Sequence, residues 1–506
     1  MPSSLYGIYN TQRSLSLNQA AIDIINSNVS NMNTAGYSKQ RLEISQASNI
    51  SPYESPIDAS QSGSGAVIDN ISRNRDLFID NSFRKETTDA NYYKEYSDNA
   101  VQLENTVNQL GDTGLNTALN DFYNSLSQLA SSPNDYVVRS SVIQNAQTLT
   151  TQFNNTYTSM QDMRTGLVGD TATPNTLTQS KLSIDINDLN GKLSAVANLN
   201  DKINVSTAQG ITPNALLDQR DQLLDKISEY IPVSITNEKN NTVTVTLGSV
   251  ELVNGKEQKG IFSVTAGDVN NPSVVQIKNS GGSTFSNNAY SLMTSGKIGA
   301  ILQMGGSDST KLTIKDKMDT LNTLATQFAS AMNAVQTGGK YIDSSTTPQT
   351  LSANIPSDFF LDSANTTLNI TAGNIKVNDA LVSDPYQIAA GAVTSGPSET
   401  GDGSNALLMT QVRDKQDLIG LGGTTTQGYL TNMVGKLGTQ SKNLQDNNDI
   451  KDNTLQQITT KRDSLTGVNL DEELTDLVRF QRSYEASAKI MTTLSQTLTT
   501  IINMVG

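Results

Sequence analysis

The most regular hydrophobic pattern in this chain lies at its two ends. From residue 470 to residue 505 an apolar side chain recurs at every seventh position, and no Pro or Gly interrupts the segment. This row consists of Leu470, Leu477, Tyr484, Met491, Leu498 and Val505. A weaker second row, with polar residues between its members, stands four residues further on at Leu474, Ala488 and Ile502. The pattern is typical of a coiled coil and predicts one long helix, whose stripe needs partner helices from this chain or from neighbouring copies.

The N-terminal segment repeats this pattern. Its row has the same spacing of seven and consists of Ile8, Leu15, Ile22 and Val29. The pattern stops within residues 27–37, where Asn, Ser, Thr and Gly mark a helix end followed by a turn. Gly36 is the natural residue for the left-handed conformation that closes such a helix. We expect the two terminal helices to pack together; two independent surface helices are the alternative.

Between the ends, helical spacing gives way once to a period of two. Apolar residues three and four apart predict helices within residues 96–129, 142–196, 216–227, 314–335 and 430–458. The period of two begins at residue 242 and recurs at 261–265 and 274–278, which predicts antiparallel strands. Residues 338–400 are rich in Gly, Ser and Thr, with short strand-like runs at 368–370 and 375–377.

We therefore predict an α+β fold that is elongated and divided into several domains. Both chain ends would form coiled-coil-like helical domains, with antiparallel β domains inserted between them and placed at the far tip. A string of separate domains is the alternative, but each helical block has one apolar stripe that another block must cover. The predicted domains are residues 1–47 with 466–506 (terminal helical domain), 48–230 with 296–338 and 401–465 (helical bundle), 231–295 (β domain) and 339–400 (small mixed insertion).

Composition excludes several catalytic chemistries. The 506 residues include no His and no Cys, which excludes His-dependent triads, thiolate nucleophiles and Cys-based metal sites. The net charge of −14 disfavours nucleic acid, because binding to phosphates needs clustered Lys and Arg. No apolar run is long enough to predict membrane insertion, and the first residues lack the basic and apolar regions of a cleavable signal peptide.

Few residue clusters could carry chemistry of another kind. Residues 401–404 and 420–423 are Gly-rich but match no nucleotide-binding loop, and residues 446–452 lack the ligand spacing of a calcium loop. A carboxylate pair could still hydrolyse a glycoside, and the densest acidic cluster is Asp471, Glu472 and Glu473. Their place at the start of a predicted helix is explained by the helix dipole. We predict no catalytic residue, no cofactor and no metal ion.

Segments near both ends resemble a known family. Residues 27–37 resemble the N-terminal signature of the bacterial flagellar axial proteins, which are the rod, hook and hook-associated proteins. Residues 467–473 and 480–486 resemble the C-terminus of the first hook-associated protein family, and so do the interior segments 217–224 and 295–300. The motif positions are Asn28, Asn31, Asn33, Thr34, Gly36, Tyr37, Asn469, Leu470, Asp471 and Glu473. Residues 231–400 share little with the family beyond their β character.

The resemblance implies a structural protein of the bacterial flagellum at the junction between hook and filament. It would be secreted unfolded through the flagellar type III apparatus and would polymerise helically through the apolar rows of its terminal helices. Implied partners are copies of itself, the hook protein, the second hook-associated junction protein, and an export chaperone that binds the C-terminal helix. Alternatives are another flagellar axial protein (hook, distal rod or second junction protein) and an extracellular carboxylate-based glycosidase.

Overall fold

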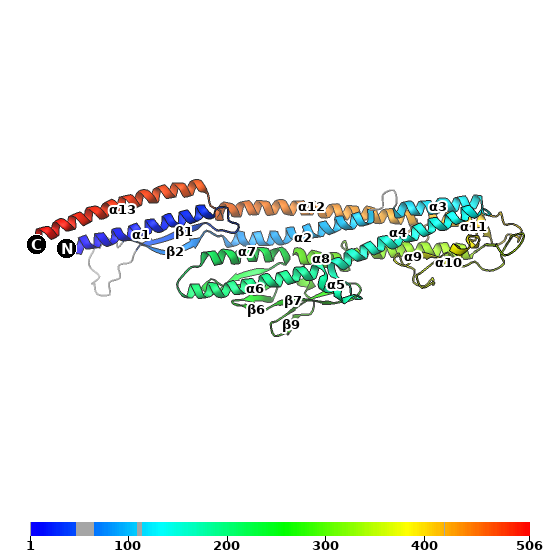
Figure 1. Cartoon of the computed structure of the whole chain (residues 1–506), viewed down its shortest axis with the longest axis horizontal. Helices are drawn as coiled ribbons and strands as arrows, with labels where there is room; N and C mark the ends of the chain where they lie inside the picture. The colour runs from blue at the N-terminus through cyan, green and yellow to red at the C-terminus, as the bar shows by residue number, and fades with distance from the viewer. Residues whose placement is uncertain (1, 47–64, 109–113, 419, 506) are drawn as a thin grey trace.

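The molecule is a long, narrow rod of helices with small sheets along one flank and at one end (Figure 1). The computed structural model describes residues 2–46, 65–108, 114–418 and 420–505. Both termini lie at the same end, because the chain runs out along the rod and returns. Long helices and several small antiparallel sheets confirm the predicted elongated α+β fold. None of the helices within the described ranges is long and apolar enough to cross a membrane.

At the end that carries both termini, the first and last helices lie side by side (Figure 1). Helix α1 (Pro2–Asn31) packs along α13 (Leu470–Val505), which confirms the predicted contact between the chain ends. An antiparallel hairpin of β1 (Gln40–Gln46) and β2 (Ala66–Arg73) packs against α1. We call these four elements the terminal unit.

Two long helices continue the terminal unit into the rest of the rod. Helix α2 (Leu77–Asn108) runs beside the returning α12 (Thr426–Thr466). The far end contains α3 (Leu115–Ser131), α4 (Tyr136–Val168), α9 (Ile314–Thr337) and α11 (Ser404–Gln411). Asp135 caps the N-terminus of α4: its carboxylate accepts a hydrogen bond from the Val137 amide at 2.8 Å. The chain therefore begins a new helix here after α3.

A second layer along the middle of the rod carries most of the β-structure (Figure 1). Its helices are α5 (Pro174–Gln179), α6 (Lys181–Ala208), α7 (Asn214–Tyr230) and α8 (Gly296–Gly305). One antiparallel sheet consists of β3 (Ser234–Asn237), β4 (Val243–Leu247), β5 (Val250–Asn254) and β6 (Glu257–Gln258). The other consists of β7 (Ile261–Ala266), β8 (Ser273–Lys278) and β9 (Thr284–Ser286).

The antiparallel strands predicted within residues 231–295 are confirmed, but their predicted place at the far tip is wrong. Strands of both sheets contact α6, which lies along the flank of the rod. The apolar side of the strands is buried there; Val243, Val245 and Leu247 are at most 1% exposed. The alternating pattern identified a buried face but not the helix that covers it.

Residues 339–400 form short two-stranded ladders near the far end. These ladders pair β10 (Gly339–Lys340) with β15 (Gly391–Ala392), β11 (Ile342–Asp343) with β12 (Thr350–Leu351), and β13 (Phe360–Leu361) with β14 (Lys376–Val377). The short helix α10 (Asp379–Ser383) follows. Single 3-10 turns lie at Lys239–Asn241, Tyr290–Leu292, Pro385–Gln387 and Val412–Asp414.

The strand predicted at 375–377 is present as β14, whereas residues 368–370 form a turn. Nearby side chains form hydrogen bonds with backbone groups that would otherwise pair with a neighbouring strand. Asp362 accepts a hydrogen bond from the Thr366 amide at 2.7 Å, and the Asn374 amide group donates to the Asn369 carbonyl at 2.8 Å. Such local bonds compete with a strand ladder, and Leu368 is left 84% exposed.

One continuous hydrophobic core extends from the middle of the rod to its far end. It contains an aromatic cluster in which the Phe122 ring lies 5.8 to 5.9 Å from the rings of Phe328, Phe359 and Phe360. These side chains are fully buried and come from α3, α9 and the segment around β13. Side chains of residues 339–400 are thus part of the same core as the helices. Residues 109–113, which fall within the stretch 96–129 that the sequence predicts to be helical, lie outside the described residues.

Two buried arginines, one near each end of α4, bind backbone carbonyls of other segments. Arg139 donates to the carbonyls of Pro133 (2.6 Å) and Ile388 (2.8 Å), and burial lowers its pKa to about 10. Arg164 donates to the carbonyls of Gly305 (2.8 Å) and Val269 (3.0 Å). Backbone carbonyls therefore compensate the desolvation of each guanidinium and attach distant segments to one helix.

Candidate assembly interface

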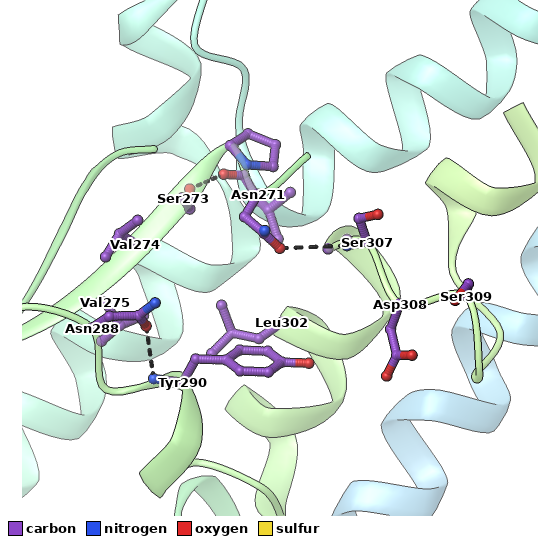
Figure 2. A pocket seen from close by; sticks show the side chains of 14 residues that line it. Asn271, Ser273, Val274, Val275, Asn288, Tyr290, Leu302, Ser307, Asp308 and Ser309 are labelled. Atoms are coloured by element: carbon purple, nitrogen blue, oxygen red, sulfur yellow. Dashed lines mark hydrogen bonds between the residues drawn. The ribbon is translucent and has the colours of Figure 1, made fainter. Parts of the chain in front are cut away.

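The pocket shown in Figure 2 does not present the carboxylate pair of a glycosidase. Among the described residues, no group of three or more Asp or Glu side chains could hold a metal ion. The pocket in Figure 2, between β8 and the end of α8, has a volume of about 500 Å³, and its one acidic lining residue is Asp308. Asp308 already accepts hydrogen bonds from the amide and hydroxyl of Thr310. Glycoside hydrolysis generally uses a pair of carboxyl groups, and this pocket supplies a single one.

The N-terminal motif forms a turn around the buried amide of Asn28, which is 1% exposed. Its Oδ1 accepts hydrogen bonds from the Tyr37 hydroxyl (2.8 Å) and the Gln40 amide (2.9 Å). Its Nδ2 donates to the Gln40 carbonyl (3.0 Å) and to Glu473 Oε2 (3.1 Å). All four hydrogen-bonding positions of this amide are occupied. One side chain therefore joins the end of α1, the start of β1 and the first turn of α13.

Glu473 is the C-terminal half of this contact. Its carboxylate is buried, and its second oxygen pairs with Lys39 Nζ at 3.0 Å. Lys39 also pairs with Glu472 at 3.1 Å. Burial lowers the pKa of Lys39, but its hydrogen bonds to Glu473 and Glu472 outweigh this effect, so the pKa is raised. The sequence explains Glu473 only by the favourable interaction of its charge with the helix dipole. In the structure, the Glu473 carboxylate also connects the two motifs through Asn28 and Lys39.

The remaining N-terminal motif residues shape the turn. The Asn31 amide donates to the Ser27 carbonyl at 2.9 Å and accepts from the Thr34 hydroxyl at 3.3 Å. Gly36 has a φ of 80°, so a side chain there would strain the backbone. Burial raises the pKa of Tyr37, which therefore keeps the proton that it donates to Asn28. Asn33 is exposed and makes no contact that would explain its place in the motif.

In the C-terminal motif, Asn469 begins the last helix. Its Oδ1 accepts a hydrogen bond from the Asp471 amide at 3.0 Å, which satisfies one free amide of the first turn of α13. Asp471 is exposed, and Leu470 is 40% exposed. The first turn thus holds the acidic residues that the helix dipole favours, and only Glu473 among them is buried.

The predicted apolar rows lie at the edge of the α1–α13 contact. The half-buried members of the rows are Ile8, Leu15, Ile22, Val29, Leu477, Met491 and Leu498. Leu470 and Tyr484 are exposed, and the side chain of Val505 lies outside the described residues. A row that is only half covered within one chain is available to a second helix. The role of these residues in assembly stays a prediction.

The centre of the α1–α13 contact is partly polar. The hydroxyls of Ser14 and Ser487 are hydrogen-bonded at 3.1 Å, and Leu494 packs close to Gly7. The residues of α13 that contact α1 form a row three residues after the heptad positions: Glu473, Ser487 and Leu494. We call it the inner row. In the predicted second row, four residues after the heptad positions, Leu474 is 46% and Ile502 is 61% exposed, and only Ala488 is half-buried. The apolar pattern missed the inner row because two of its members are polar.

A charge cluster joins the terminal unit to the rest of the rod, and hydrophobic periodicity could not detect it. Its side chains are at most 17% exposed. The cluster consists of Arg73, Arg75, Arg84, Arg220, Arg462, Asp80, Asp218, Asp221 and Asp225. We call it the joint cluster. The one sequence signal was the segment 217–224, which resembles the family and contributes three of these residues.

Acid is expected to weaken the joint cluster through Asp221. Burial raises the pKa of this carboxyl, but Arg220, Arg73 and Arg75 together bring it down to about 2. Because the folded pKa lies below the usual Asp value of about 3.9, the stabilisation is complete above pH ~4 and is lost as the pH falls towards 2. We expect a loss of about 2 kcal/mol over this range, measured as a falling Tm.

The Asp221→Asn variant should melt lower than the wild type at neutral pH and show a shallower fall of Tm between pH ~4 and 2. Asp98→Asn is the matched control, because the Asp98 side chain is 67% exposed and pairs only with the exposed Lys94. An identical acid profile for Asp221→Asn and the wild type would contradict the assignment.

Asn28→Leu is expected to loosen the terminal unit selectively. The change leaves the Tyr37 hydroxyl, the Gln40 amide and Glu473 without their buried partner, at about 1–3 kcal/mol for each unsatisfied group. Hydrogen exchange in α1, β1 and α13 should become faster, while the far-end helices keep their protection. Asn33→Leu, at an exposed position, should leave exchange unchanged. Equal exchange in both variants would show that Asn28 does not hold the turn.

Comparison with known proteins agrees with this architecture. The family described as "Flagellar hook-associated protein FlgK helical domain" matches residues 100–350, and the family described as "Flagellar basal body rod FlgEFG protein C-terminal" matches residues 464–504. Flagellar hook-associated protein 1 of Bacillus subtilis (strain 168) is 28% identical, with 100% of this chain and 99% of that protein covered. The protein of the same name from Escherichia coli (strain K12) is 24% identical over 98% of this chain and 99% of its own length.

A solved structure supports the fold. The flagellar hook junction protein FlgK from Burkholderia pseudomallei superposes with a TM-score of 0.59 at 17% identity, covering 76% of this chain and 100% of that chain. Paired terminal helices, with a C-terminal segment that matches the rod-protein family, place the chain among the flagellar axial proteins. Within that class, the chain belongs to the flagellar hook-associated protein 1 family.

Proposed function

We infer that this protein is a structural subunit of the bacterial flagellum that forms the junction between hook and filament. It is exported and becomes part of the flagellum outside the cell. The observation that supports assembly through the ends is the exposure of α13. Seven of its large apolar side chains are between 38% and 80% exposed: Leu470, Leu474, Val478, Tyr484, Ile490, Ile502 and Met504. Isolated soluble proteins rarely leave so many large apolar side chains of one helix exposed to water.

Neighbouring copies of this chain are the first proposed partners of that face. Side-by-side contacts of the same surfaces on successive copies do not close on themselves, and they build a helical tube. The hook protein would lie on one side of this layer and the second hook-associated junction protein on the other. Before export, a chaperone would cover α13, since the same apolar side chains would otherwise promote aggregation.

We propose no catalytic role. The family is structural, and the arrangement of buried charge in the described chain is explained by packing between helices. In this proposal, assembly depends on the apolar side chains that the terminal helices leave exposed.

Deleting the gene for this chain is the direct test of the proposed function. Cells without it should build hooks of normal length but no filaments, and flagellin should accumulate in the medium. Wild-type protein supplied from a plasmid should restore filaments and motility. Normal filaments in the deletion strain would contradict the junction role, and loss of the hooks as well would assign the chain to an earlier stage of the axial structure.

A further inference from the structure

The terminal unit is joined to the rest of the rod without a shared hydrophobic core. The continuous core begins at Tyr96 and ends at Leu437, and no described side chain of the terminal unit belongs to it. The buried apolar side chains of α1 (Ala21, Ile24 and Ile25) lie within the terminal unit instead. We call residues 77–466 the body.

The chain crosses between the two parts at residues 74–76 and 467–469. Beside these crossings, the backbone amide of Lys39 donates to the Thr466 carbonyl at 2.8 Å. The Thr212 hydroxyl donates to Asn70 at 2.7 Å, and Ser38 donates to Asp218 at 2.7 Å. The joint is therefore held by hydrogen bonds and charges.

Arg73 is the central contact of this joint. It lies on β2 of the terminal unit, and its Nη1 atom contacts Asp218 Oδ1 and Asp221 Oδ2 of α7, both at 2.8 Å. Behind it, the guanidinium groups of Arg75 and Arg220 lie 3.4 and 2.9 Å from Asp221. Buried charges of this kind strongly resist separation, because each one left without a partner in a low-dielectric site is destabilising.

We propose that the joint cluster is a latch that fixes the angle between the terminal unit and the body. When the latch is released, the terminal unit swings as a rigid piece about residues 74–76 and 467–469. The absence of a shared apolar core means that little hydrophobic area opposes this motion. A cavity of about 380 Å³ beside the cluster, lined by Arg73, Arg75 and Asp221, gives water a route to the separated charges. The latch is a property of the isolated chain and does not depend on the junction role.

Paired spin labels would measure this angle directly, because the chain has no native Cys. One pair, Gln456→Cys on α12 and Ala486→Cys on α13, spans the joint at exposed positions. A second pair, Ser16→Cys on α1 and Ala486→Cys, lies within the terminal unit. In the otherwise wild-type chain, we expect a single narrow distance distribution for each pair.

Arg73→Gln, which removes both contacts to α7, should broaden the distribution across the joint and leave the distribution within the terminal unit narrow. Asp221→Asn should have the same effect. Lys442→Gln is the matched charge control, since Lys442 and Asp446 form an exposed pair on α12 with side chains 67% and 54% exposed. Circular dichroism would establish that each variant is folded.

Three outcomes would overturn the proposal. A narrow distribution across the joint in both folded variants would show that other contacts fix the angle. A broad distribution in the wild type would show that no latch is closed. Broadening of both label pairs in the variants would mean that the terminal unit melts and does not swing. If Arg73→Gln does not fold, Asp221→Asn provides the test, because Arg73 keeps its contact with Asp218 in that variant.

Discussion

Leu474→Asp is expected to abolish incorporation of this protein into flagella while its Tm stays the same. Leu474 lies on the outer face of α13 and is 46% exposed in the single chain, so an Asp there disturbs little within the monomer. In an assembled tube the same side chain would be covered. Losing a buried Leu removes about 1.5–3 kcal/mol per subunit, and stranding a charge adds to this loss. Together these effects weaken each contact by roughly a hundredfold or more.

Filament counts, motility and flagellin in the medium would measure this effect, with the Tm of the purified variant beside them. Asn187→Asp places the same charge on the exposed face of α6 and should be neutral in every assay. Leu477→Asp should behave differently again, because the half-buried Leu477 also packs within the terminal unit, so both assembly and local stability should fall. A lowered Tm for Leu474→Asp, or normal filaments, would contradict an intersubunit role for the outer face.

Phe122→Ala is expected to cause the largest loss of stability of any single change considered for the body, about 3–5 kcal/mol. Phe122 is fully buried and contacts Phe328, Phe359 and Phe360. Its removal leaves a cavity where α3, α9 and the segment around β13 meet. The Tm should fall by several degrees, and proteolysis should reach residues 339–400 first, because that segment loses its anchor.

Phe78→Ala is the matched control for the aromatic core. Phe78 is 79% exposed at the start of α2, and removing its ring should change the free energy of unfolding by less than about 0.5 kcal/mol. If Phe122→Ala changed stability as little as Phe78→Ala, residues 339–400 would be an independent module and the core would not be continuous.

Hydrophobic periodicity predicted the long elements well. The row from Leu470 to Leu498 identified α13, and the mirrored row identified α1 and its contact with α13. Hydrophobic periodicity considers apolar positions alone, so it could not reveal the inner row, in which the polar residues Glu473 and Ser487 face α1. Hydrophobic periodicity could not reveal the joint cluster either, because the sequence does not show whether an Arg side chain is buried or exposed.

Tertiary placement was harder to predict than the elements themselves. The pattern at Val243–Leu247 identified β-structure but carried no information on which helix covers it, so the flank was mistaken for the tip. The hairpin of β1 and β2 gave no clear alternation and was not predicted; Leu42 and Glu43 have similar burial in β1. The four-part division of the chain stays a prediction, and the continuous core around Phe122 is the feature that any such division must accommodate.

Photo-crosslinking in assembled flagella would test the central claim most directly. Benzoylphenylalanine would replace Leu474, and the cells would be irradiated before their flagella are detached and purified. We expect a covalent adduct between this protein and another axial subunit, and no adduct from the same label at residue 187 on α6. Absence of an adduct at residue 474 in flagella that contain the labelled protein would contradict assembly through the outer face of α13.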